Sequence, residues 1–255
     1  MIIIPLVENK KPKNRELNSE KGLSLYIETN SKKIIFDLGQ YDIFKKNAIK
    51  FGIFFDEVDK FIVSHGHYDH FGGYNFLTSF EREKSIFHKE ACNNFKMGCI
   101  LYKNIGNFKN RDGGVDGQKI EIFKNIYLIN TKLKRPSLFC KIDGKRDYFE
   151  HEYHLVTMEN GSLNIVTGCC HCGLYELIKK VKEEFPNIKI NSISGGIHTR
   201  NIIFKSIYIV RGIFLLKSEK INMLNLGHCT GELATWILGK FLKVNKLRVG
   251  EKINI

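Results

Sequence analysis

Three histidines and an aspartate gather in one short stretch of the chain, 64-SHGHYDHFGG-73. Imidazole and carboxylate groups are the ligands that borderline and hard divalent metal ions favour. His65 and His67 are two residues apart, so in an extended segment their side chains point the same way and can share one ion. Asp69 and His70 follow, where a turn can direct them at a second ion. The spacing therefore predicts a metal site with room for two ions.

Two further histidines are expected at the ends of strands. His171 lies in 167-TGCCHCG-173 and His228 in 227-GHCTG-231. Either one alone is more typical of a structural histidine, but together they can complete the first cluster. The predicted metal ligands are then His65, His67 and His171 for one ion, and Asp69, His70 and His228 for the other.

The order of these motifs resembles the metallo-β-lactamase superfamily, from an Asp after a strand through the His-x-His-x-Asp-His block to the two later histidines. Within it, the segments GLS, FDLG, SHGHYDHFGG, TGCCHCG, SGGIH and GHCTG are similar to one subfamily. Many of its members are named 7,8-dihydropterin-6-methyl-4-(β-D-ribofuranosyl)aminobenzene-5′-phosphate synthase. The resemblance runs from about Gly22 to Gly231 and implies an α/β or α+β fold, the four-layer αββα sandwich.

The resemblance also implies roles for individual residues. Asp37 is expected to orient the histidine block without binding metal itself; a plain turn residue before Gly39 is the alternative. Asp69 is expected to be catalytic as well as a ligand. Many relatives carry a metal-bridging Asp where this chain has 194-SGGIH-198. His198 is therefore predicted to be an extra ligand or a substrate-facing acid or base, with a structural role as the third possibility.

Two residues are candidates for substrate binding. Arg200 can clamp a phosphate or carboxylate through two parallel hydrogen bonds, although a solvated surface Arg is nearly as plausible. Thr230 precedes an expected helix, where free backbone N–H groups can receive an anion. A plain N-cap role for Thr230 is the equal alternative.

The cysteines around His171 allow two other interpretations. Cys169 and Cys172 have the spacing of a redox dithiol, and the Cys-Cys-His-Cys run suggests a small zinc site. Both are weak, because a zinc knuckle needs wider spacing and a redox pair normally opens a thioredoxin-like helix. Cys229 can approach the metals, but packing is the simpler expectation for it.

The chain is expected to form a single domain over residues 1–255. Strands are predicted at 23–29, 33–39, 60–64, 153–159, 162–168, 188–194 and 221–226, and helices at 42–52, 173–185, 202–216 and after Gly231. Asn160-Gly161 is a strong hairpin signal. The Gly-rich stretch 104–119 is predicted to be a mobile loop and a candidate lid.

Composition sets the outer limits. The 255 residues carry 40 Lys and Arg against 27 Asp and Glu, a formal net charge of +13. The excess is mostly scattered Lys, with no dense block or nucleic-acid motif, so we do not expect nucleic acid as the main partner. No apolar run reaches the roughly 18–20 residues of a membrane helix. The chain is expected in the cytoplasm, with its seven cysteines reduced.

These observations predict a dinuclear metal-dependent enzyme acting on a small anionic, phosphorylated substrate. Zinc is the expected metal, with iron and manganese as alternatives. The reaction is either hydrolysis by a metal-activated hydroxide or, as the subfamily name implies, condensation of a pterin with a phosphorylated arylamine. The alternatives are an RNA or DNA nuclease of the same superfamily and a metal-bound sensor or effector without turnover. The oligomeric state is left open.

Overall fold

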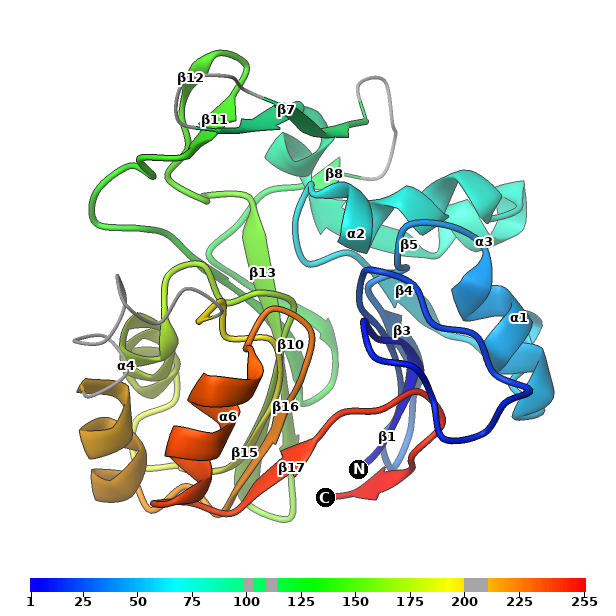
Figure 1. The fold of residues 1–255 in the computed structure, drawn as a ribbon. Helices are drawn as coiled ribbons and strands as arrows, with labels where there is room; N and C mark the ends of the chain where they lie inside the picture. Colours follow the sequence, from blue (N-terminus) through cyan, green and yellow to red (C-terminus); the bar gives the residue numbers. More distant parts are fainter. Residues whose placement is uncertain (99–102, 109–113, 200–210) are drawn as a thin grey trace. The chain divides into compact units, whose positions relative to one another are not determined.

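The computed structural model describes residues 1–98, 103–108, 114–199 and 211–255 (Figure 1). The chain divides into two compact units, each with its own sheet and its own buried apolar core. The first unit comprises residues 1–117, 132–153 and 248–255, and the second comprises 118–131 and 154–247. Because the chain crosses between the units four times, neither is one contiguous segment. The single-domain expectation stays a prediction.

The first unit is built on a seven-stranded sheet of order β18-β1-β2-β3-β4-β5-β8. Its strands β1 to β3 are antiparallel, and β3, β4 and β5 run parallel. The predicted hairpin before residue 39 is confirmed by β2 and β3. The strand bounds are β1 (Ile2–Val7), β2 (Ser24–Glu28), β3 (Lys33–Phe36), β4 (Lys60–Ile62), β5 (Ser85–His88), β8 (Gly114–Val115) and β18 (Ile253–Asn254).

Short helices accompany this sheet. The predicted helix at 42–52 is confirmed as α1 (Ile43–Lys50), whose Phe44 and Ala48 lie in the apolar core. The metal-ligand motif forms α2 (Tyr68–Phe71) directly after β4. A third helix, α3 (Ser79–Glu83), begins with a capping box in which Thr78 and Glu81 satisfy each other's backbone N–H groups. The 3₁₀ turns are η1 (Phe55–Glu57), η2 (Gly72–Phe76) and η3 (Lys89–Cys92).

The first unit also contains a four-stranded sheet of order β12-β11-β6-β7 that the sequence did not predict. Its strands are β6 (Asn94–Met97), β7 (Lys103–Asn107), β11 (Cys140–Ile142) and β12 (Lys145–Arg146). The predicted lid at 104–119 therefore begins inside a strand and includes β8, while its residues 109–113 lie outside the described part. Backbone pairing with β6 explains the difference, because it overrides the turn-rich composition of this stretch.

The second unit is built on a seven-stranded sheet of order β17-β16-β15-β14-β13-β10-β9. The predicted hairpin at Asn160-Gly161 is confirmed, and both turn residues have positive φ, of 50° and 71°. From β14 to β17 the strands are parallel. The strands are β9 (Lys119–Phe123), β10 (Ile126–Thr131), β13 (Glu152–Glu159), β14 (Ser162–Thr167), β15 (Lys189–Gly195), β16 (Met223–Leu226) and β17 (Val244–Lys246).

Helices follow three of these parallel strands. They are α4 (Leu174–Glu184), residues 211–218 and α6 (Glu232–Gly239). The predicted helix at 202–216 is described only from residue 211. Since the strands are parallel, the carboxyl ends of β14, β15 and β16 meet at one edge of the sheet, and the loops that follow them lie together. These loops carry the predicted residues His171, His198 and His228.

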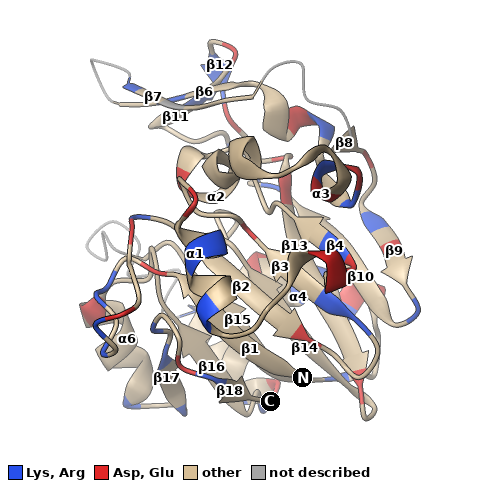
Figure 2. Ribbon diagram, turned by 90° about the vertical axis from the view of Figure 1, so that its right-hand side faces the viewer, with Lys and Arg blue, Asp and Glu red and all other residues tan. Residues whose placement is uncertain are grey.

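Charge is distributed widely over the described chain. Figure 2 shows Lys and Arg interspersed with Asp and Glu on many elements. Within the described residues, no helix is long and apolar enough to cross a membrane.

Candidate metal centre

His65 and His67 present ring nitrogens to each other within the first unit. Nε2 of His65 lies 3.1 Å from Nδ1 of His67, and both side chains are buried. Two nitrogens bound to one tetrahedral zinc at about 2.0–2.1 Å are separated by about 3.3 Å. The spacing of this pair therefore fits two ligands of one ion.

Ser64 fixes which nitrogen of His65 is available. The Ser64 hydroxyl lies 2.9 Å from Oδ2 of Asp37 and 2.8 Å from Nδ1 of His65. A carboxylate only accepts, so the hydroxyl donates to Asp37 and its oxygen accepts from the N–H at Nδ1 of His65. The Nε2 of His65 is then the unprotonated nitrogen, which is the form that binds a metal ion.

Asp37 fixes the ring of His70 directly, through Nδ1. Its carboxylate is fully buried and lies 2.6 Å from Nδ1 of His70. It also accepts the backbone N–H of Ser64 at 2.7 Å. The Asp37 backbone has a left-handed φ of 61°, a conformation that directs the carboxylate to these partners. The carboxylate accepts the N–H at Nδ1, so Nε2 of a neutral His70 is the unprotonated nitrogen, the form that binds a metal ion.

Asp69 lies in the first turn of α2, beside the histidines. Its backbone carbonyl accepts the N–H of Leu23 at 3.1 Å, and a Cβ at Gly22 would lie only 2.6 Å from that oxygen. Its carboxylate is partly exposed and pairs with Lys21 at 3.4 Å. The backbone of Asp69 is therefore fixed while its side chain reaches solvent.

Burial keeps His67 neutral. The pKa of His67 is lowered to about 3, chiefly by desolvation and also by the nearby imidazoles of His151 and His70, against the opposing charge of Asp69. A neutral imidazole is the metal-binding form, so His67 is ready to bind across the whole neutral range.

His151 is a buried histidine that the sequence analysis missed. Its Nε2 lies 3.1 Å from Oδ2 of Asp147, and its Nδ1 accepts the backbone N–H of Gly66 at 3.4 Å. With both nitrogens engaged, His151 supports the backbone between His65 and His67 and does not act as a ligand. No spacing signal could have found it, because it lies more than 80 residues along the chain from Gly66.

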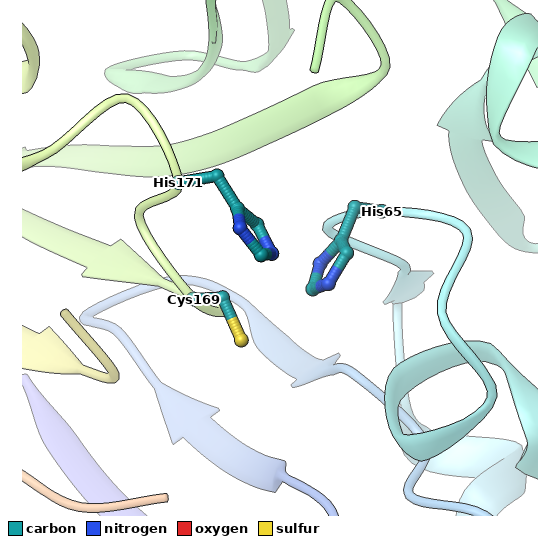
Figure 3. A group of neighbouring side chains, drawn as sticks. All are labelled: His65, Cys169 and His171. Carbon is teal, nitrogen blue, oxygen red and sulfur yellow. The ribbon is translucent and has the colours of Figure 1, made fainter. Parts of the chain in front are cut away.

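In the second unit, Cys169 and His171 lie on the loop after β14. Figure 3 shows both side chains extending to the same side of that loop; it also labels His65, on the segment that follows β4. The His171 ring lies 4.3 Å from the ring of His198, measured between centroids. The structure thus brings His198 next to a predicted metal ligand of its own unit.

The loops after β15 and β16 are joined by three hydrogen bonds. The N–H of Ile197 donates to Oγ1 of Thr230 at 3.3 Å, and the hydroxyl of Thr199 donates to the carbonyl of Thr230 at 2.8 Å. The N–H of His198 donates to Sγ of Cys229 at 3.2 Å. These bonds hold the loop that carries His228.

The two predicted substrate-binding residues have different outcomes. Thr230 is fully buried, and the N-cap of α6 is Gly231, so the plain N-cap interpretation of Thr230 is wrong. Its hydroxyl is used within the fold because it accepts the N–H of Ile197. Arg200 lies outside the described residues.

None of the six described cysteines forms a disulfide with another. Sγ of Cys170 lies 4.0 Å from Sγ of Cys172, so Cys172 has Cys170 as its close sulfur partner in place of the Cys169 that the dithiol spacing suggested. The hydrogen bond from Cys170 lowers the pKa of Cys172 to about 5, against the effect of burial and with help from His154. These two thiols lie in the apolar core of the second unit.

The donors present fit divalent metal ions. The first unit supplies buried imidazoles with defined acceptor nitrogens, together with the Asp69 carboxylate, and this set suits zinc, iron or manganese. The second unit supplies His171, His198 and His228 on loops at one sheet edge, with Cys169 and Cys229 among them.

Comparison with known proteins finds sequences that are similar to this chain. No family model matches the chain. An uncharacterized protein of Methanocaldococcus jannaschii, MJ0448, is 27% identical over 93% of this chain and 94% of its own length. The 7,8-dihydropterin-6-methyl-4-(β-D-ribofuranosyl)-aminobenzene-5′-phosphate synthase of the same organism is 28% identical, over 90% and 87%.

A solved structure matches as well. The crystal structure of Tm1679, described as a metal-dependent hydrolase of the β-lactamase superfamily, aligns with a TM-score of 0.87 and 28% identity. The alignment covers 100% of this chain and 99% of that one. The chain has the metallo-β-lactamase fold, which confirms the predicted fold class and the resemblance to this superfamily.

Proposed function

We propose that this chain is a dinuclear metal-dependent enzyme acting on a small anionic, phosphorylated substrate. The observation that carries the proposal is the buried set of Asp37, Ser64, His65, His67 and His70, in which Asp37 and Ser64 hold the ring proton of His65 and of His70 on Nδ1. A histidine cluster that served only packing would not need these fixed tautomers.

The proposed ligand sets are those that the resemblance implies. One ion takes His65, His67 and His171, and the other takes Asp69, His70 and His228. These sets combine residues of the first unit with residues of the second, and that combination is part of the proposal. Zinc is the proposed metal, with iron and manganese as the alternatives that an N/O donor set allows.

Metal ions bound to these ligands supply an activated water at neutral pH and an electrophile for a carbonyl or phosphoryl oxygen. The chain's own residues prepare that chemistry. Asp37 and Ser64 hold the histidine tautomers, and burial keeps His67 deprotonated. The Asp69 carboxylate, partly exposed, is placed to hold or accept a proton from a reacting group.

An anionic substrate is supported by charge and by the relatives. The net charge of +13 favours a phosphate-bearing ligand over a cation. The related M. jannaschii protein is named as the synthase of a phosphorylated product, and Tm1679 is described as a hydrolase. The synthase name supports a phosphate-bearing ligand, and the description of Tm1679 supports dependence on metal ions. Arg200 remains the proposed substrate contact, whereas the buried Thr230 holds the loop that carries His228 and does not touch the substrate.

The experiment is a substrate screen with protein that has been purified without chelator and loaded with zinc, iron or manganese. Phosphoesters, thioesters, lactones and a dihydropterin with a phosphorylated arylamine are the test compounds. The proposal expects turnover of at least one anionic compound, and loss of it in a His65→Ala, His67→Ala double variant. RNA cleavage with a steep salt dependence would favour the nuclease alternative. Metal binding without turnover of any compound would favour a sensor.

A further inference from the structure

Three donors of the second unit lie close together without belonging to the ligand sets above. Sγ of Cys169, a ring nitrogen of His198 and Sγ of Cys229 all lie within 4.8 Å of one another. They come from the loops that follow β14, β15 and β16, at one edge of one sheet. Two sulfurs bound to one tetrahedral zinc at about 2.3 Å are about 3.8 Å apart, so small side-chain movements would let the three donors share one ion.

We propose that Cys169, His198 and Cys229 form a further metal site. It has two sulfur ligands and one nitrogen ligand, and it suits a thiophilic divalent ion such as Zn²⁺ or Cd²⁺. Thiolates select soft and borderline metals, whereas the histidine and carboxylate cluster of the first unit suits harder ones as well. The site assigns His198 as a metal ligand, where the sequence left it between ligand and substrate-facing acid or base.

The backbone around the three donors is held in an uncommon conformation. Cys170, His198 and His228 have φ of 53°, 47° and 51°, and each is one of the donors or its immediate neighbour. Residues other than glycine adopt this left-handed region rarely, and such strain collects at functional sites. Three strained positions, one on each loop, bring the two sulfurs and the imidazole together.

Gly196 makes room for the Cys229 sulfur. A Cβ at Gly196 would lie 2.6 Å from Sγ of Cys229 and 2.6 Å from the carbonyl oxygen of Gly168. The sulfur therefore packs against a bare α-carbon, which fixes its position relative to the loop that carries His198.

Hydrogen bonding prepares Cys229 as a thiolate ligand. Its sulfur accepts the backbone N–H of His198 at 3.2 Å. An N–H that points at a sulfur stabilises negative charge on it, as amide donors do for metal-bound thiolates in general. Cys169 is nearly completely buried, with 4% of its surface exposed, so an ion bound here is shielded from bulk water.

This site goes beyond the proposed function because its three donors belong to neither main ligand set, although Sγ of Cys169 also lies within 4.8 Å of ring nitrogens of His171 and His228. The test can therefore be made on full-length protein that carries His65→Ala and His67→Ala, which weakens the nitrogen and oxygen sites. Co²⁺ is the probe, since sulfur-to-cobalt charge transfer gives a near-ultraviolet absorption band that nitrogen and oxygen ligands do not produce. We expect one equivalent of Co²⁺ to develop this band, and Cd²⁺ to displace it.

Matched variants assign the sulfurs. Cys169→Ser and Cys229→Ser should each weaken the band strongly, and His198→Ala should weaken Co²⁺ binding at least about 10-fold. Cys92→Ser and Cys140→Ser, which change thiols of the first unit, should leave the band unchanged. Circular dichroism and the thermal midpoint of the metal-free variants show that each one folds. Cd²⁺ should raise the midpoint of the parent but not that of Cys229→Ser.

A folded parent without the band would overturn the inference, and so would a band that survives unchanged in either Cys169→Ser or Cys229→Ser. The two proposals fail separately. A missing band in a protein that still binds two metals and turns over substrate refutes only the thiolate site. A band in a protein with no activity in the substrate screen refutes only the proposed enzyme.

Discussion

Oδ2 of Asp37 lies 2.6 Å from Nδ1 of His70, and both side chains are completely buried. The same carboxylate receives the Ser64 hydroxyl, whose oxygen in turn faces Nδ1 of His65. One aspartate thus sets the tautomer of two histidines, directly for one and through a hydroxyl for the other. Its role in the proposed site is to keep Nε2 of His65 and Nε2 of His70 unprotonated, so that each can act as a metal ligand.

Asp37→Asn should therefore weaken metal binding by about 10–100-fold, because the amide has only one acceptor oxygen where the carboxylate has two. The measurement is metal affinity by competition with a chromogenic chelator. Asp59→Asn is the matched control, since Asp59 also accepts a backbone N–H in the first unit but lies away from the histidines. Equal affinities of Asp37→Asn and the parent would refute this role.

Asp69→Asn should remove most of the activity found in the substrate screen while the fold survives. The backbone carbonyl of Asp69, and not its carboxylate, holds the N–H of Leu23, so the substitution leaves that contact intact. A neutral amide is a poor metal ligand and a poor proton acceptor. Thermal unfolding and turnover measured on the same sample separate the two effects, and a fully active variant would show that Asp69 is not catalytic.

The metal-free protein should lose stability as the pH falls from about 6.5 toward 3. Burial lowers the pKa of His67 to about 3 in the folded state, while the unfolded chain titrates near 6.5. Between these values the unfolded chain binds more protons, so the free energy of unfolding rises with pH. The contribution from His67 is a few kcal/mol at most.

Urea unfolding at a series of pH values, with a chelator present, measures this dependence. His67→Asn should show a shallower dependence over the same window, since the amide does not titrate. A parent and a variant with the same pH dependence would show that His67 is not the titrating group.

Gly196→Ala should destabilise the protein by about 1–3 kcal/mol, because the new methyl group would overlap Sγ of Cys229 and the Gly168 carbonyl. Gly239→Ala is the control: no atom lies within 4 Å of its added Cβ, and alanine favours a helix by about 0.5–1 kcal/mol. Chemical denaturation of both variants gives the comparison. If Gly196→Ala left the free energy of unfolding unchanged, the three loops would be less tightly held than the structure indicates.

Local signals in the sequence predicted the parts of the fold that local chemistry decides. Asn160-Gly161 predicted the β13–β14 hairpin because few residue pairs adopt two successive positive φ angles. The helix predicted at 173–185 is confirmed as α4. The His-x-His-x-Asp-His block marked the first-unit site because its ligands are close in sequence.

Pairing between distant segments could not be predicted in this way. Strand β6 pairs with β11 more than 40 residues later, and neither has a strong pattern of its own. His151 supports Gly66 from a distant loop, and no spacing connects the two. Cys229 was expected to be a packing residue. Its proximity to Cys169 depends on two loops meeting at a sheet edge, and the spacing of the two residues in the sequence does not indicate that contact. Only the folded sheet shows that these sulfurs are neighbours.

The most direct test of the central claim is elemental analysis of the full-length protein after purification without chelator. The proposed enzyme predicts about two transition-metal ions per chain in its two main ligand sets, with zinc the principal element, and about one more where the thiolate site is also filled. The His65→Ala, His67→Ala variant should hold markedly less metal than the parent. Freshly prepared, folded protein that contains no transition metal, and takes up none from a zinc, iron or manganese solution, would contradict the account.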